Sequence, residues 1–303
     1  MKKTKRETQL PWERPKLESE EPKVHELVKK IKNSPTYKIA VEDEDFLYSD
    51  ATRGIRLELD YLKAELEIQK YGIEHTIVVF GSARIKEHQT AMDELKEIQE
   101  KLDKKPEDRK LLREFYIAER MVEKSIYYED ARRFGRLVGE SGKGVNDCKV
   151  VVMTGGGPGI MEAANRGSYD VGAKTIGLNI HLPHEQFPNP YITPELCFQF
   201  HYFAVRKMHF LNRAKALVVY PGGFGTFDEL FETLTLIQTH KTQSIPVILV
   251  GKGYWEKAID FEFLKEEGVI APEDLDIFKF ADNANEAWEY ILKWHKKEGS
   301  PLY

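Results

Sequence analysis

The chain has 303 residues, of which 41% are hydrophobic and 31% are charged, and its formal net charge is −5. This length suits one large domain or two of ordinary size, and the composition is typical of a globular, soluble protein. The negative charge disfavours nucleic acid as the main partner, because phosphate backbones are bound by basic surfaces.

The N-terminus and the cysteines indicate the compartment. The first residues are charged with no apolar segment behind them, and no apolar run approaches the roughly 20 residues of a membrane span. The two cysteines, Cys148 and Cys197, are far apart and cannot form a disulfide framework. We therefore expect a cytoplasmic protein without a signal peptide or contact with a membrane.

The N-terminal part is predicted to be an arm followed by helices. Residues 1–35 are charged and interrupted by four prolines, which predicts a mobile arm with a short helix near residues 24–31. Residues 51–71 carry apolar side chains near helical spacing. After the first strand, residues 87–140 form two highly charged helical segments broken near Pro106. We interpret these segments as an insertion that projects from the core or packs on a partner.

From residue 76 onward, short β-rich runs alternate with helical patterns. Strands are expected at residues 76–80, 150–153, 175–179, 217–220 and 247–250. Helices are expected at residues 160–169, 203–212, 226–238, 254–266 and 285–296. This alternation predicts an α/β fold, a doubly wound Rossmann-like parallel sheet with helices on both faces. The expected division is an N-terminal arm with helices at 1–72 and a Rossmann-like domain at 73–303.

Three glycine-containing turns follow predicted strands, at the edge where doubly wound sheets bind ligands. The first turn is Gly81-Ser82-Ala83-Arg84. Its small side chains would let a nucleotide approach, with Arg84 near a phosphate or the base. The alternative is a tight turn with a surface arginine.

The second turn contains Gly155, Gly156, Gly157 and Gly159 and is followed by Met161. Consecutive glycines leave successive N–H groups free to form an anion-binding concavity. The spacing matches neither GxGxxG nor GxxxxGK[ST], which disfavours nicotinamide dinucleotides and Walker-type ATP hydrolysis. The alternative is close packing of helix on sheet without a ligand.

The third turn, at residues 221–229, has the sequence PGGFGTFDE and is the most informative segment of the chain. Gly222, Gly223 and Gly225 allow a sharp bend and a close approach to a ligand. The helix that follows offers unpaired N–H groups and a partial positive charge to an anion. Thr226 adds a hydroxyl group and Glu229 a carboxylate one turn farther on, so a phosphate site and an acid lie side by side.

Together these turns resemble the LOG-like family, formerly labelled lysine decarboxylase-like, whose best-known members are cytokinin riboside 5′-monophosphate phosphoribohydrolases. The resemblance covers about residues 74–260 and includes the pair Arg206-Lys207. It implies that Arg206 and Glu229 are catalytic. We expect no cofactor and no metal. The residues expected to bind the phosphate or the nucleotide are Gly81, Ser82, Arg84, Gly155, Gly156, Gly157, Gly159, Met161, Lys207, Gly222, Gly223, Gly225 and Thr226.

The resemblance implies hydrolysis of the N-glycosidic bond of a purine nucleoside 5′-monophosphate, with AMP as the expected substrate. The products would be the free base and ribose 5-phosphate. Glu229 would stabilise an oxocarbenium-like ribosyl cation or activate water. Arg206 would bind the phosphate or hold Glu229 ionised. The family's short members lack the arm and the insertion, so selectivity for a prenylated adenine stays open.

Two other classes of protein remain as alternatives. A non-catalytic carrier of a nucleotide or a phosphorylated cofactor would use the same phosphate site, but it would not need both Arg206 and Glu229. A single-stranded DNA-binding scaffold is disfavoured by the acidic balance of the chain. We also expect a homo-oligomer supported by the arm and by the charged insertion.

Three further patterns contain residues that can carry chemistry. His181 and His184 stand in an HxxH pattern, but no third ligand is identifiable, so we expect a loop rather than a metal site. Lys207 would have to be a buried amine to form a Schiff base with pyridoxal phosphate, and it lies instead on a polar turn. Tyr202 and Phe203 would either stack on a base or pack in the core.

Overall fold

The computed structural model describes residues 16–20, 22–141, 150–182, 187–300 and 302. By their internal contacts the residues form two units, Met1–Glu58 and Leu59–Tyr303, and the boundary lies within helix α3 (Arg53–Lys70). The predicted division of the chain into an N-terminal part at 1–72 and a Rossmann-like domain at 73–303 stays a prediction. The predicted arm before residue 16 lies outside the described residues, as do Cys148 and His184.

The first unit consists of short helices. They are α1 (Val24–Lys32), α2 (Glu44–Leu47), the start of α3, and three 3-10 turns at Pro35–Tyr37, Ala40–Glu42 and Asp50–Thr52. The hydroxyl group of Thr52 donates to the carbonyl of Leu47 (2.7 Å), and the guanidinium of Arg56 donates to the carbonyl of Ser49 (2.7 Å). These bonds tie the end of α2 to the start of α3. The short helix predicted near residues 24–31 is confirmed.

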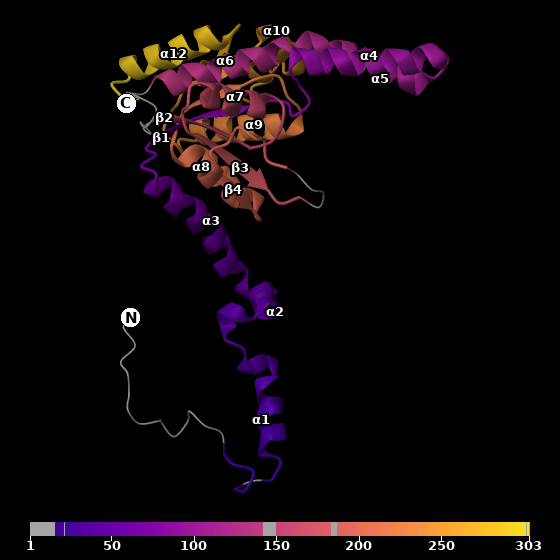
Figure 1. Ribbon diagram of the computed structural model, residues 1–303. Coiled ribbons are helices and arrows are strands. Elements are labelled where there is room, and N and C mark those ends of the chain that lie inside the picture. The colour runs from indigo at the N-terminus through magenta and orange to yellow at the C-terminus, as the bar shows by residue number, and fades with distance from the viewer. Residues whose placement is uncertain (1–15, 21, 142–149, 183–186, 301, 303) are drawn as a thin grey trace. The chain divides into compact units, whose positions relative to one another are not determined.

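The second unit is built around a seven-stranded parallel sheet with the order β4-β3-β2-β1-β5-β6-β7 (Figure 1). The strands are β1 (His75–Phe80), β2 (Val150–Thr154), β3 (Thr175–Ile180), β4 (Cys197–Phe200), β5 (Ala214–Val219), β6 (Val247–Val250) and β7 (Phe278–Ala281). The central strands are buried and read as continuous apolar runs, as expected for parallel strands covered on both faces. The strand order reverses between β1 and β5, which is the switch point where such sheets bind ligands.

The helices that surround this sheet lie on both of its faces. They are α3, α4 (His88–Lys104), α5 (Arg109–Lys124), α6 (Ile126–Glu140), α7 (Ile160–Asp170), α8 (Phe203–Asn212), α9 (Phe224–Gln238), α10 (Lys252–Ala258), α11 (Phe261–Glu266) and α12 (Ala284–Lys297). Ile77 and Val79 of β1 face a core shared by α6, α7 and α12. Phe80 points the opposite way, and its ring lies 4.8 Å from that of Phe210 on α8. The predicted α/β fold is confirmed.

Two strands were not predicted, and both lie at an edge of the sheet. β4 has the sequence CFQF and β7 the sequence FKFA. Each has only four residues and one exposed polar side chain, so neither forms the continuous apolar run that marks a buried strand.

The charged segment predicted as two helices forms three, because a break at Ser125 separates α5 from α6. The side chain of Ser125 donates to the carbonyl of Val122 (2.6 Å) and hydrogen-bonds the ring of His88 (2.8 Å). α4 and α5 lie side by side and extend past the sheet (Figure 1). The predicted helix at 254–266 is also divided, into α10 and α11, and Asp260 caps the latter.

The third of these helices, α6, belongs to the core rather than to the insertion. Phe134 on α6 is fully buried. α6 and α7 touch backbone to backbone: a Cβ at Gly135 would lie 2.1 Å from the carbonyl oxygen of Ala164, and one at Gly167 would lie 1.9 Å from that of Arg132. The true insertion therefore comprises α4 and α5.

Among the residues that the structure describes, no helix combines the length and the apolarity needed to cross a bilayer.

A buried polar network fixes the second glycine turn. Asn165 on α7 accepts from the hydroxyl group of Thr154 (2.7 Å) and from the side-chain amide of Asn189 (2.9 Å), and donates to Thr175. The backbone N–H of Asn189 donates to the carbonyl of Gly156 (2.9 Å). The network joins β2, β3 and α7 below the turn.

We expect Asn165→Ala to lower the free energy of unfolding by about 3 kcal/mol, because it leaves several buried polar groups without partners. Asn285→Ala removes an exposed asparagine and is the control, with an expected change within about 0.5 kcal/mol. Urea denaturation of both variants measures the difference. Equal midpoints for the two variants would contradict a structural role for the network.

Candidate functional site

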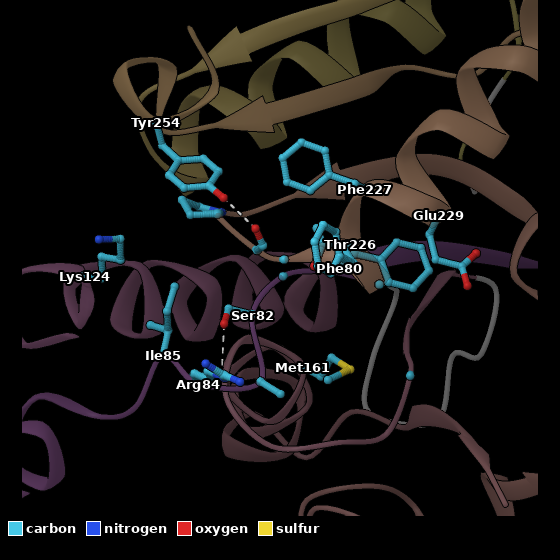
Figure 2. Close-up of a pocket in the computed structure, with 18 of the residues that line it drawn as sticks. Phe80, Ser82, Arg84, Ile85, Lys124, Met161, Thr226, Phe227, Glu229 and Tyr254 are labelled. Atoms are coloured by element: carbon cyan, nitrogen blue, oxygen red, sulfur yellow. Dashed lines mark hydrogen bonds between the residues drawn. The ribbon is translucent and has the colours of Figure 1, made fainter. Parts of the chain in front are cut away.

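The carboxyl ends of β1, β2 and β5 meet at a cavity of about 1020 Å³ (Figure 2). Most of the predicted site residues line it, although they come from four separate parts of the chain. Those that line it are Gly81, Ser82, Arg84, Gly155, Met161, Arg206, Gly222, Gly223, Gly225, Thr226 and Glu229. Gly156, Gly157, Gly159 and Lys207 do not line it.

Backbone hydrogen bonds join the three glycine turns. The N–H of Ser82 donates to the carbonyl of Pro221 (3.0 Å), which ties the first turn to the third. The carbonyl of Ser82 accepts from the N–H of Ile160 (3.1 Å), the first residue of α7. Gly159 has φ of +73°, and a Cβ there would lie 2.4 Å from the same carbonyl oxygen. Gly159 is therefore required by packing between the first two turns.

The second turn is divided between the cavity and the protein interior. A Cβ at Gly155 would lie 4.0 Å from Nη1 of Arg206, so this glycine faces the site. Gly156 has φ of +71°, and its Cβ would collide with the side-chain oxygen of Asn179. The carbonyl of Gly157 accepts from Asn189 (3.1 Å). Gly156, Gly157 and Gly159 therefore fit the alternative interpretation of the second turn, in which the glycines allow close packing without a ligand. A role for them in nucleotide binding stays a prediction.

The third turn opens onto the cavity at the amino end of α9. Cβ atoms at Gly223 and Gly225 would meet no heavy atom within 4 Å, whereas one at Gly222 would lie 2.1 Å from the hydroxyl oxygen of Thr226. The N–H groups of Phe224 and Gly225 lie in the first turn of α9, where a helix provides no acceptor. The open space and the free amides together form a place for an anion.

Glu229 and Arg206 form a buried ion pair at one end of this cavity. Nη2 of Arg206 lies 3.6 Å from Oε1 of Glu229, and the two side chains are 13% and 7% exposed. Burial raises the pKa of Glu229 to about 7, although the charges of Lys207 and Arg206 act in the opposite direction. Arg206 does favour the ionised form of Glu229, as predicted, but the desolvation of the carboxylate outweighs it. A carboxylate with this pKa is present in both forms near neutral pH.

Arg206 is held by aromatic rings as well as by Glu229. Its guanidinium lies 4.9 Å from the ring centre of Phe203 and 5.4 Å from that of Phe210. Its Nε is buried and has no hydrogen-bond partner in the described part of the chain. Phe203 contacts the arginine and is not part of the cavity wall. One buried donor of Arg206 is therefore available to a ligand or to water.

Lys207 points away from the cavity and links α8 to α9. Its amine lies 2.8 Å from carboxylate oxygens of both Asp228 and Glu232. Burial would lower the pKa of Lys207, but the hydrogen bonds to these carboxylates raise it overall. A protonated amine in this setting does not form a Schiff base, and its predicted role in phosphate binding stays a prediction.

Helix α3 positions α8, a function that the sequence did not predict. The carboxylate of Asp60 accepts from the backbone N–H groups of His201 (3.0 Å) and Tyr202 (2.9 Å), at the start of α8. Glu65 accepts two hydrogen bonds from Arg213, at its end. Both ends of the helix that carries Arg206 are therefore fixed by carboxylates of α3.

Several cavity residues have no signal in the local sequence. Met121 and Lys124 come from α5, and Tyr254 from α10. The hydroxyl group of Tyr254 donates to the carbonyl of Gly222 (2.5 Å). Phe224, at the mouth, is 97% exposed. The fold brings the first three to the site from segments that carry no motif.

The HxxH pattern of His181 and His184 cannot be assigned to a metal site in the described part of the chain. His184 lies outside the described residues, and His181 does not line the cavity. Within the described ranges, no group of three or more His, Cys, Asp or Glu side chains is arranged to hold a metal ion.

Comparison with known proteins supports the family resemblance. A family model described as "Possible lysine decarboxylase" matches residues 161–291. A probable cytokinin riboside 5′-monophosphate phosphoribohydrolase from Oryza sativa subsp. japonica, LOGL3, is 26% identical over 163 residues, covering 50% of this chain and 74% of the relative. LOG3 of Arabidopsis thaliana, a cytokinin riboside 5′-monophosphate phosphoribohydrolase, is 29% identical over 140 residues, which are 45% of this chain and 63% of the relative. These matches confirm the resemblance to the LOG-like family.

Two solved structures show a remote likeness. The Moco carrier protein of Chlamydomonas reinhardtii is 17% identical with a TM-score of 0.42, covering 74% of this chain and 99% of that chain. The molybdenum cofactor binding protein of Rippkaea orientalis is 19% identical with a TM-score of 0.39, covering 55% of this chain and 87% of that chain. Likeness at this level carries no information about ligands.

The raised pKa of Glu229 predicts how stability depends on pH. The folded protein holds a proton on Glu229 up to about pH 7, whereas the unfolded chain releases it near the ordinary value of 4.5. The stabilisation is therefore complete below pH 4.5 and is lost as the pH rises through 7. Relative to Glu229→Gln, we expect the wild type to lose on the order of 3 kcal/mol between pH 4.5 and 8. Urea denaturation of both proteins across this pH range measures their free energies of unfolding. If the difference between the two free energies does not change with pH, the raised pKa of Glu229 is contradicted.

Proposed function

We propose that the protein hydrolyses the N-glycosidic bond of a purine nucleoside 5′-monophosphate, releasing the free base and ribose 5-phosphate. One observation carries the proposal: a single cavity contains both the open amino end of α9 and the buried pair of Glu229 and Arg206. A phosphate site alone suits any phosphorylated ligand, but a buried carboxylate beside it suits chemistry at a sugar carbon.

The phosphate would bind at the third turn. The N–H groups of Phe224 and Gly225 would donate to it, with Gly223 providing the space. Glu229 follows Gly225 by four residues, about 6 Å along the helix axis. A ribose bound by its 5′-phosphate would then extend toward the carboxylate, which fixes the anomeric carbon relative to the acid.

Glu229 in its ionised form would stabilise the positive charge that develops on the ribose as the C1′–N bond breaks. Water would add its oxygen to C1′, and the base would leave with a proton. Arg206 would favour the ionised form of Glu229 against the effect of burial, and its unpartnered Nε would bind a ribose oxygen or a phosphate oxygen. The pair thus provides a carboxylate that reacts near neutral pH.

The remaining details of the prediction are part of this proposal. AMP is the proposed substrate, and the printed names of the relatives, riboside 5′-monophosphate phosphoribohydrolases, support the reaction class. The cytoplasmic location and the homo-oligomer stay predictions. The non-catalytic carrier stays the alternative function.

A panel of nucleoside 5′-monophosphates, with free base read by chromatography, tests the reaction. We expect Glu229→Gln to lower kcat by roughly 10²–10⁴-fold, because it removes the carboxylate that the transition state needs. Glu256→Gln, an exposed carboxylate on α10 that does not line the cavity, is the control and should keep most of the activity. For the wild type, kcat/KM should rise with pH through about 7, the pKa of Glu229, and then level off.

Three outcomes would count against the hydrolase. Glu229→Gln turning over at the wild-type rate would remove Glu229 from the chemistry. A rise of kcat/KM near pH 4.5 instead of 7 would contradict the buried state of its carboxyl group. Nucleotide binding by the wild type without release of any base would favour the carrier.

Gly225→Ala separates ligand binding from folding. The new methyl group would meet no protein atom within 4 Å, and alanine in a helix is about 0.5–1 kcal/mol more favourable than glycine, so the variant should be at least as stable as the wild type. It would nevertheless occupy space beside the proposed phosphate and should weaken nucleotide binding about tenfold or more. Gly253→Ala, in α10, is the matched control, because its position is equally open and outside the cavity. Calorimetry should show weaker nucleotide binding for Gly225→Ala and unchanged binding for Gly253→Ala. Equal affinities of the two variants for the nucleotide would contradict the phosphate site.

A further inference from the structure

Two cationic side chains, Lys124 and Arg84, line the cavity at the end opposite Glu229. Figure 2 shows both to one side of Thr226 and Glu229 to the other. The proposed hydrolysis of a monophosphate does not require Lys124. This lysine comes from α5, the insertion, and no motif of the sequence predicted it.

Neither of these cations has an ion-pair partner among the described residues. Within the described part of the chain, neither side chain forms an ion pair or a hydrogen bond. By contrast, Lys86, two residues after Arg84, is paired with Glu94. In a chain with a net charge of −5, two unpaired cations on one cavity wall point to an anionic ligand.

The position of Lys124 is fixed by the core. It is the last residue of α5, and the next residue, Ser125, is buried and bonded to His88. Tyr127 follows on α6 and packs against Gly251, where a Cβ would lie 2.5 Å from the tyrosine hydroxyl oxygen. Gly251 begins α10, which carries Tyr254 into the same cavity. The base of the insertion is therefore packed onto the cavity wall and holds Lys124 there.

The order of the groups along the cavity indicates what Lys124 and Arg84 would bind. If the anomeric carbon lies at Glu229 and the 5′-phosphate at the amino end of α9, any group attached to that phosphate extends toward these cations. A cavity of about 1020 Å³ leaves room beyond a monophosphate. We propose that Lys124 and Arg84 form a subsite for a second phosphate, so that the preferred ligand is a nucleoside 5′-diphosphate. This inference rests on the proposed function for the orientation of the ligand.

The subsite leaves the chemistry unchanged. The C1′–N bond breaks, water supplies oxygen to C1′ and a proton to the base, and the diphosphate stays intact on the ribose. Lys124 and Arg84 determine specificity and are not catalytic, because they contact only the distal phosphate.

The test measures the affinities for AMP and ADP by calorimetry. We expect the wild type to bind ADP at least tenfold more tightly than AMP, and Lys124→Gln to reduce this ratio about tenfold through loss of a charged hydrogen bond. Arg84→Gln should reduce it similarly. Lys110→Gln, on the same helix but outside the cavity, should leave it unchanged, and thermal unfolding of each variant shows that it is folded. A higher salt concentration should lower the ratio for the wild type.

The outcomes separate this proposal from the hydrolase. A ratio near one in the wild type, or a ratio that Lys124→Gln does not change, overturns the subsite even if AMP is hydrolysed. Tight ADP binding that depends on Lys124, without release of adenine by chromatography, supports the subsite and overturns the hydrolase. Binding of neither nucleotide overturns both proposals.

Discussion

The hydrogen bond between the N–H of Ser82 and the carbonyl of Pro221 is the constraint on which the site depends. It joins the ends of β1 and β5, two strands far apart in the sequence that pair at the switch point of the sheet. The same serine accepts from the first amide of α7. One small residue therefore connects the three glycine turns and the start of α7, so that the turns meet at one cavity.

The buried pair of Glu229 and Arg206 is an electrostatically unfavourable arrangement that the surrounding fold holds in place. Burying a carboxylate is unfavourable, and an arginine at 3.6 Å compensates only in part, so the pKa of Glu229 stays raised to about 7. The surroundings hold this arrangement in place: α3 fixes α8 at both ends, and Lys207 ties α8 to α9 through Asp228. Unfavourable electrostatics at a site surrounded by rigid supports is typical of functional residues.

The sequence predicted the features that local patterns encode. The central strands form continuous apolar runs, and the third turn combines glycines with Glu229 at helical spacing, so the sheet and most of the residues that line the cavity were predictable. β4 and β7 were missed because edge strands have no such run. The break at Ser125 was missed because a serine within a charged helix is no strong stop signal; its bond to His88 is tertiary. Lys124 and Tyr254 reach the cavity only through the packing of α6 and α10, which no local pattern shows.

The close contact of α6 with α7 has a consequence for the protrusion formed by α4 and α5. Because Gly135 and Gly167 bring the backbones of α6 and α7 together, the helix that directly follows the protrusion is packed firmly into the core. The tip of the protrusion is the short connection between Lys104 of α4 and Arg109 of α5, at the end of the two helices. A label or a graft placed at this connection would therefore lie away from the sheet and from the cavity at its edge (Figure 1).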